Sequence, residues 1–167
     1  MNRIYSISFL ENAVQTQEYV TKVISFFRYY TGEEKRVIRL KDEMDVVAQF
    51  AEILAISTGN SLRIDFSAES EEASNIYIPA RSLLFFVRDI FIQEDVKAGY
   101  LSVRASAKEN GIIVRMALHC MANDRLDSCV KDLEKRFESF YSSEIRISLN
   151  EQNNALWEIL FELPKEK

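Results

Sequence analysis

The sequence is poor in the residues that mark linkers, disulfide frameworks and histidine chemistry. Its 167 residues include four glycines, two prolines, two cysteines and one histidine. So few glycines and prolines exclude a low-complexity or linker-rich chain. Cys120 and Cys129 are too few for a disulfide framework or a structural zinc site. A single histidine, His119, excludes most catalytic and metal-binding designs based on that residue.

Long apolar runs and excess positive charge are also missing. No run of 18 apolar residues occurs, and the N-terminus lacks the apolar core of a signal peptide, so we expect no membrane contact. The net charge of −5 argues against a nucleic-acid binder. A chain of 167 residues, 47% of them hydrophobic, suits a compact domain with a full core. We therefore expect a cytoplasmic protein.

Apolar periodicity predicts a mixed α/β fold. Helical spacing predicts helices over residues 7–27, 44–55, 79–91 and 126–141, the third beginning at Pro79. Strict alternation predicts strands over residues 62–66, 101–105, 112–118, 145–149 and 157–163. Asn110-Gly111 indicates a hairpin turn, and the acidic stretch 69–72 a solvated loop. The order predicts a two-layer α/β sandwich, with a mixed sheet, helices on one face and a helical hairpin in front.

Four motifs follow one another along the chain. They are S-I-S-F-L-E-N at 6–12, F-R-Y at 27–29 with V-I-R-L-K-D-E at 37–43, Ile78-Pro79 before an apolar helix, and Arg136-Phe137 with Tyr141. They resemble, in order, N-P-H-F-L-F-N, then L-R-Y with V-x-L-x-x-E, then I-P-x-x-x-L-Q-P-L-V-E-N-A-x-K-H-G, then R-L-x-x-x-Y. The motifs that they resemble are those of the cytoplasmic kinase region of LytS/YehU-type sensor histidine kinases. The resemblance covers about residues 6–164.

The resemblance implies a GHKL-type (Bergerat) ATP-binding fold and a role in two-component signal transduction. It implies a helical dimerisation and phosphoacceptor-like region over residues 1–58, followed by an ATPase-like domain over residues 59–167. It also implies that the chain is the cytoplasmic part of a membrane-bound sensor, with Mg-ATP as cofactor in an active member.

The departures from the family pattern fall on its chemistry. Ser8 stands at the phosphoacceptor histidine, and a serine without a neighbouring base cannot replace an imidazole nucleophile. The family's Glu-Asn pair, base and magnesium ligand, falls on Arg88-Asp89, and an arginine accepts no proton. Asp89 either keeps a vestigial magnesium site or forms a helix-surface salt bridge. Leu118 replaces the aspartate that contacts adenine, and no glycine after Gly111 can build a phosphate cradle.

The remaining candidates have ordinary structural explanations. His119 has no carboxylate partner in the sequence pattern and is expected at the surface. Cys120 and Cys129 are expected to be small apolar residues rather than a redox pair, with Cys129 on a buried helix face. The aromatic cluster at residues 26–30 favours core packing or a protein interface over nucleic-acid stacking.

We therefore expect a pseudokinase without catalytic residues, bound metal or cofactor, which acts by protein–protein interaction. The expected partners are a second copy of the chain, a partner kinase or a response regulator. The dimer interface is expected on the first helix, at Ile7, Leu10, Val14, Val20, Val23 and Phe27; a fold-back of this helix onto the sheet would instead give a monomer. Two alternatives remain, namely an active histidine kinase or ATPase in which Asp89 holds the metal of Mg-ATP, and an anti-sigma-like binding module.

Overall fold

The computed structural model describes residues 2–10, 13–32, 37–58, 61–91, 98–109, 111–119, 126–141, 146–153 and 156–164. The helices are α1 Asn2–Leu10, α2 Val14–Thr31, α3 Leu40–Thr58, α4 Glu71–Ser74, α5 Ser82–Phe91 and α6 Leu126–Tyr141. The strands are β1 Val37–Arg39, β2 Ser61–Ala68, β3 Tyr77–Pro79, β4 Ala98–Lys108, β5 Gly111–His119, β6 Arg146–Asn153 and β7 Leu156–Pro164.

The five predicted strands form one mixed sheet. Its order is β2-β4-β5-β7-β6, in which β2 and β4 are parallel and every other neighbouring pair is antiparallel. The predicted hairpin is confirmed, because Lys108 of β4 pairs with Gly111 of β5. Residue 145, the predicted start of one strand, lies outside the described residues. The short antiparallel pair of β1 and β3 was not predicted.

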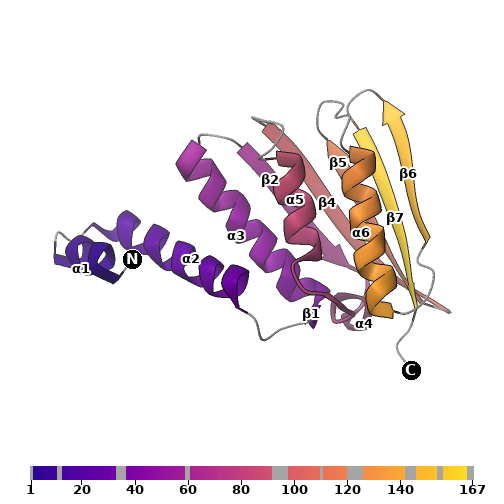
Figure 1. Cartoon of the computed structure of the whole chain (residues 1–167), viewed down its shortest axis with the longest axis horizontal. Helices are drawn as coiled ribbons and strands as arrows, with labels where there is room; N and C mark the ends of the chain where they lie inside the picture. Colours follow the sequence, from indigo (N-terminus) through magenta and orange to yellow (C-terminus); the bar gives the residue numbers. More distant parts are fainter. Residues whose placement is uncertain are drawn as a thin grey trace.

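Helices cover one face of this sheet. In Figure 1, α3, α5 and α6 lie side by side in front of the strands, and α2 and α1 extend beyond α3. The apolar positions of α5 and α6 point inward because they recur every three to four residues, and they meet the alternate residues of β4, β5 and β7. Buried as predicted are Leu83, Leu84, Val87, Leu133 and Phe137. The predicted two-layer α/β sandwich is confirmed.

The prediction of one helix over residues 7–27 is wrong. Helix α1 ends at Leu10 and α2 begins at Val14, with Ala13 between them at φ −83° and ψ 75°, outside the helical region. Figure 1 shows α1 doubling back beside the start of α2. The two segments contact each other, but Ile7, Leu10 and Val14 of the apolar stripe stay exposed.

Two further boundaries differ from the sequence prediction. Pro79 is the last residue of β3 rather than the first of a helix, because it pairs with Val37 of β1. Helix α5 starts at Ser82, whose hydroxyl donates to the Pro79 carbonyl oxygen at 2.6 Å. The acidic stretch is exposed as predicted, but it contains a one-turn helix because the Ser70 hydroxyl accepts from the Ala73 amide at 3.1 Å.

Among the described residues, no helix has the length and hydrophobicity that crossing a bilayer requires.

Candidate functional site

Glu43, in the first turn of α3, is a buried carboxylate at which three helices meet. Its exposed fraction is 0%. One oxygen, Oε2, accepts from the hydroxyl of Tyr29 on α2 and from the backbone amide of Arg81 at 3.2 Å. The other, Oε1, accepts from the amide of Leu84 in α5, also at 3.2 Å. A single side chain therefore ties the end of α2 to the start of α5.

The surroundings of this carboxylate set the protonation of both partners. Burial raises the pKa of Glu43, although the donors from Tyr29, Leu84 and Arg81 favour its ionised form and offset part of that effect. Burial, followed by the nearby Glu43 charge, raises the pKa of Tyr29. The Tyr29 phenol therefore keeps its proton at neutral pH and acts as the donor in this pair.

Arg81 adopts a left-handed backbone conformation at this point. Its φ is 66°, which non-glycine residues adopt only at a cost. Its amide donates to the Tyr29 hydroxyl at 2.9 Å, and its Nε donates to the Tyr29 carbonyl oxygen at 3.2 Å. Its guanidinium carbon also lies 5.9 Å from the centre of the Tyr29 ring. Tyr29 therefore holds the turn that starts α5.

The resemblance motifs converge on this junction, a juxtaposition that the sequence reading missed. Tyr29 and Glu43 come from the second motif, and Arg81 follows the Ile78-Pro79 of the third. The hydroxyl of Tyr141, from the fourth motif, donates to the carbonyl oxygen of Tyr77 at 2.5 Å. Segments far apart in the sequence are thus joined around β3 and the start of α5.

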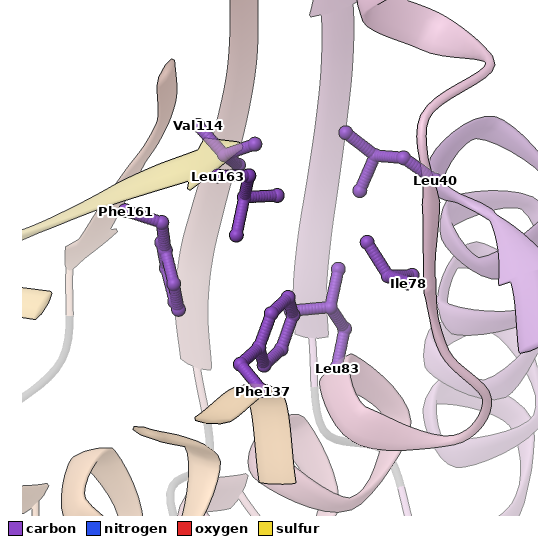
Figure 2. A pocket seen from close by; sticks show the side chains of 7 residues that line it. All are labelled: Leu40, Ile78, Leu83, Val114, Phe137, Phe161 and Leu163. Carbon is purple, nitrogen blue, oxygen red and sulfur yellow. The ribbon is translucent and has the colours of Figure 1, made fainter. Parts of the chain in front are cut away.

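A small hollow in the apolar core lies near this junction. Figure 2 shows side chains that point toward one another around a small hollow, lined by Leu40, Ile78, Leu83, Val114, Phe137, Phe161 and Leu163. Its volume is about 10 Å³, near the least that holds one water molecule, and no polar side chain lines it. The hollow is therefore a packing gap and is too small for a nucleotide.

Arg88 and Asp89, which the resemblance aligns with a base and a magnesium ligand, form an ion pair on α5. The Arg88 Nε donates to the Asp89 Oδ1 at 2.7 Å, and the Arg88 Nη1 donates to the hydroxyl of Tyr30 on α2 at 3.2 Å. Burial lowers the pKa of Arg88, but the hydrogen bonds to Asp89 and Tyr30 outweigh this and raise it. Arg88 is therefore a permanent cation, and Asp89 makes the salt bridge that was one of its two predicted alternatives.

Asp89 also borders an open groove between α5 and α6. Phe85 lies in this groove with the guanidinium carbons of Arg88 and Arg136 at 4.6 and 4.9 Å from its ring centre. Cys129, which was predicted on a buried helix face, is only half-buried and lines this groove. Across the part of the chain that the structure describes, no group of three histidine, cysteine or acidic side chains is placed to hold a metal ion.

Leu118 lies in the core at the end of β5. Its exposed fraction is 0%, and it pairs across the sheet with the buried Leu101 of β4. His119 follows it as an exposed strand-end residue, as predicted. At the start of β4, a Cβ on Gly99 would lie 2.1 Å from the ring of Phe91, so the end of α5 packs directly on the strand. Residues 120–125, including Cys120, lie outside the described residues.

The predicted interface residues are mostly exposed. Their exposed fractions are 47% for Ile7, 84% for Leu10, 55% for Val14 and 46% for Phe27, and Val23 is half-buried. Val20 departs from the prediction: it is 7% exposed, because it faces the inside of the chain rather than this surface. Ser8 lies in α1, and its side chain is outside the described part.

Two exposed residues on α1 were missed by the sequence reading. Ile4 is 57% and Phe9 66% exposed. With Ile7, Leu10 and Val14, the first residue of α2, they make up the exposed apolar residues between positions 4 and 14, a set that we call the α1 face.

The raised pKa of Glu43 predicts a specific pH dependence of stability. Because the folded chain holds this proton more tightly than the unfolded chain, Glu43 stabilises the fold fully below its ordinary value of 4.5. That contribution is lost as the pH rises through the raised folded-state pKa. The free energy of unfolding of the wild type, relative to Glu43→Gln, should therefore fall as the pH rises from 4.5 through the raised pKa of Glu43 in the folded chain.

Urea unfolding of both proteins across this range measures the difference. The NMR shift of the Glu43 carboxyl carbon gives the folded-state pKa directly, even if the variant folds poorly. A difference that stays constant with pH, or a carboxyl that titrates below its ordinary value, would contradict the prediction.

Comparisons with known proteins bear on the fold of the chain. A sequence model of the family described as "Histidine kinase" matches residues 1–62. A search of curated proteins finds no relative. Among solved structures, the nucleotide-free catalytic domain of the histidine kinase ThkA matches with a TM-score of 0.54 and 11% identity, covering 77% of this chain and 94% of that one. The fold is that of a histidine kinase catalytic domain.

Two other structures extend the likeness. The Acinetobacter baumannii histidine kinase AdeS matches with a TM-score of 0.54 and 13% identity, over 95% of this chain and 83% of that one. The histidine kinase domain of the E. coli osmosensor EnvZ matches with a TM-score of 0.51 and 12% identity, over 82% and 94%. The expected GHKL-type fold is confirmed, and the match to the histidine kinase sequence model is confined to residues 1–62.

Proposed function

We propose that this chain is a signalling module of the histidine kinase type, similar to LytS/YehU sensors, that has lost nucleotide chemistry and acts by binding protein partners. Leu118 carries the proposal. The resemblance assigns its position to an aspartate that accepts a hydrogen bond from adenine, and this side chain is wholly buried among apolar neighbours. A leucine offers adenine no acceptor, and a buried one presents no surface to a ligand.

The positions of the base and the metal ligand support the same proposal. Arg88 is a cation engaged by Asp89 and Tyr30, so it cannot take a proton from an attacking group. One carboxylate oxygen of Asp89 is paired with the Arg88 guanidinium. These residues do not fit a bound Mg-ATP, and Ser8 in α1 does not fit a phosphoacceptor.

The α1 face supplies the partner-binding half of the proposal. Five exposed apolar side chains within eleven residues, at positions 4 to 14, favour an interaction site. A second copy of the chain is the proposed occupant, paired through residues 1–58 and carrying residues 59–167 as the ATPase-like domain. A response regulator is the other proposed partner, since ThkA was solved with its response regulator TrrA, a structure matched at 15% identity and a TM-score of 0.52 over 51% of that chain.

Phosphoryl transfer gives the decisive test of the enzymatic half. The chain is incubated with Mg-ATP labelled on the γ-phosphate, and protein-bound label and released phosphate are both counted. We expect neither to exceed a heat-denatured control. Label on the chain, or phosphate release that is lost in Asp89→Asn, would instead establish an active kinase or ATPase.

A further inference from the structure

The two ends of helix α2 have different surroundings. Its 18 residues span about 27 Å. Near its start lie the exposed Val14 and the packed helix α1, and at its last turns lie Tyr29 and Tyr30. The first end is open to a partner, whereas the second is hydrogen-bonded into the domain.

The second end contacts α5 at both of that helix's ends. At the start of α5, Tyr29 holds Arg81 through its hydroxyl, its carbonyl oxygen and its ring. Further along, the Tyr30 hydroxyl accepts from Arg88, and the Tyr30 ring meets Phe85 edge-on with centres 5.9 Å apart. A shift of α2 along or about its axis therefore cannot occur without breaking contacts to α5.

Glu43 makes these contacts interdependent. Its carboxylate, buried with 0% exposure, receives donors from Tyr29, Arg81 and Leu84. If α2 withdraws, the carboxylate loses the Tyr29 donor in a place where water does not replace it. The left-handed Arg81 loses its Tyr29 contacts at the same moment, so the strained turn is free to relax. The contacts of Tyr29 with Glu43 and Arg81 should therefore form or break together, so that the junction has two states rather than a series of intermediate positions.

We propose that Tyr29, Glu43 and Arg81 form a latch that couples the position of helix α2 to the first turn of helix α5. Through it, a partner bound on the α1 face changes the outer surface of α5 and the groove beside it. The role as a regulator rests on the proposed function, whereas the latch itself is a property of the described contacts.

Amide hydrogen exchange of the full chain tests the latch. The variant Tyr29→Phe keeps the ring and removes the hydroxyl that joins Glu43 to Arg81. We expect exchange at Arg81, Leu84 and the last turn of α2 to accelerate at least fivefold, while amides of β4 and β5 keep their rates. The matched control is Tyr19→Phe, the same change at a half-buried tyrosine of the same helix, which should leave the rates at Arg81 and Leu84 within twofold of the wild type.

Three results would overturn the latch: unchanged rates in Tyr29→Phe, equal acceleration throughout the sheet, or the same local acceleration in Tyr19→Phe. In a second arm, Leu10→Glu should alter exchange at Leu84 in the wild type but not in Tyr29→Phe, and an equal effect in both backgrounds would refute the coupling. If Leu10→Glu leaves the molecular mass unchanged, the proposed pairing fails, and the Tyr29→Phe rates alone decide the latch.

Discussion

Replacing Leu118 by aspartate is expected to lower the free energy of unfolding by about 3–5 kcal/mol, the usual cost of an unpaired charge in a core. Leu118 has 0% exposure and pairs across the sheet with the buried Leu101 of β4. The same substitution restores the residue that the family resemblance places there. If a nucleotide pocket lay at this position, the aspartate would be solvated and tolerated. Urea or thermal unfolding measures the loss.

His119→Asp is the matched control for this variant. It places the same carboxylate one residue further along β5, at an exposed side chain, and should change stability by no more than about 0.5 kcal/mol. A loss below about 1 kcal/mol for Leu118→Asp, or a gain of ATP binding, would mean that Leu118 borders a solvent-filled pocket, and the pseudokinase proposal would fail.

Replacing Leu10 by glutamate is expected to convert a dimer into a monomer. Leu10 is 84% exposed in the isolated chain, the largest exposed fraction among the residues of the α1 face. In a twofold dimer each substitution occurs twice, so two charges enter an apolar interface without partners. Affinity should fall by at least a hundredfold, and light scattering at micromolar concentration should show the mass halve.

Val37→Glu provides the control for charge alone. Val37 is an apolar residue that is 37% exposed on β1, away from the α1 face, and its substitution should leave the dimer intact. A wild type that is already monomeric at this concentration, or a mass unaffected by Leu10→Glu, would contradict the proposed pairing.

The sheet and the covering helices were predictable because their patterns are long and one-sided. The nine residues of β5 alternate along the strand, so only one of its two faces can be the buried one. The structure buries Ile112, Val114, Met116 and Leu118 on that face. The break between α1 and α2 was not predictable in this way. The apolar spacing continues across Ala13, and the turn there is decided by packing between the two helices, which periodicity does not report.

The junction around Glu43 was missed although a signal for it was present. Glu43 occupies the same helical phase as the buried Leu40, Val47 and Phe50, three, four and seven residues away. An acidic residue on the apolar face of a helix predicts a buried carboxylate that needs hydrogen-bond donors from other parts of the chain. The donors themselves, Tyr29 and the amide of Arg81, could not be found from the sequence because they depend on how α2 and the β3–α5 turn fold against α3.

The resemblance identified the residues at the expected nucleotide-binding positions. Only the structure shows which side chains surround them. The motif alignment indicated Arg88, Asp89 and Leu118 as altered. It did not indicate that Tyr30 of α2 binds Arg88, because that contact joins residues 58 positions apart.

Titration calorimetry with Mg-ATP tests the account most directly. If Leu118, Arg88 and Asp89 have replaced the nucleotide site, the titration to millimolar ATP shows no heat beyond dilution, because the ligand's polar groups would lose about 1–3 kcal/mol each for want of partners. ATP without magnesium and magnesium alone serve as blanks. A saturable heat with a dissociation constant below about 100 µM, a binding free energy near −5.5 kcal/mol, would contradict the account and establish a nucleotide-binding kinase domain.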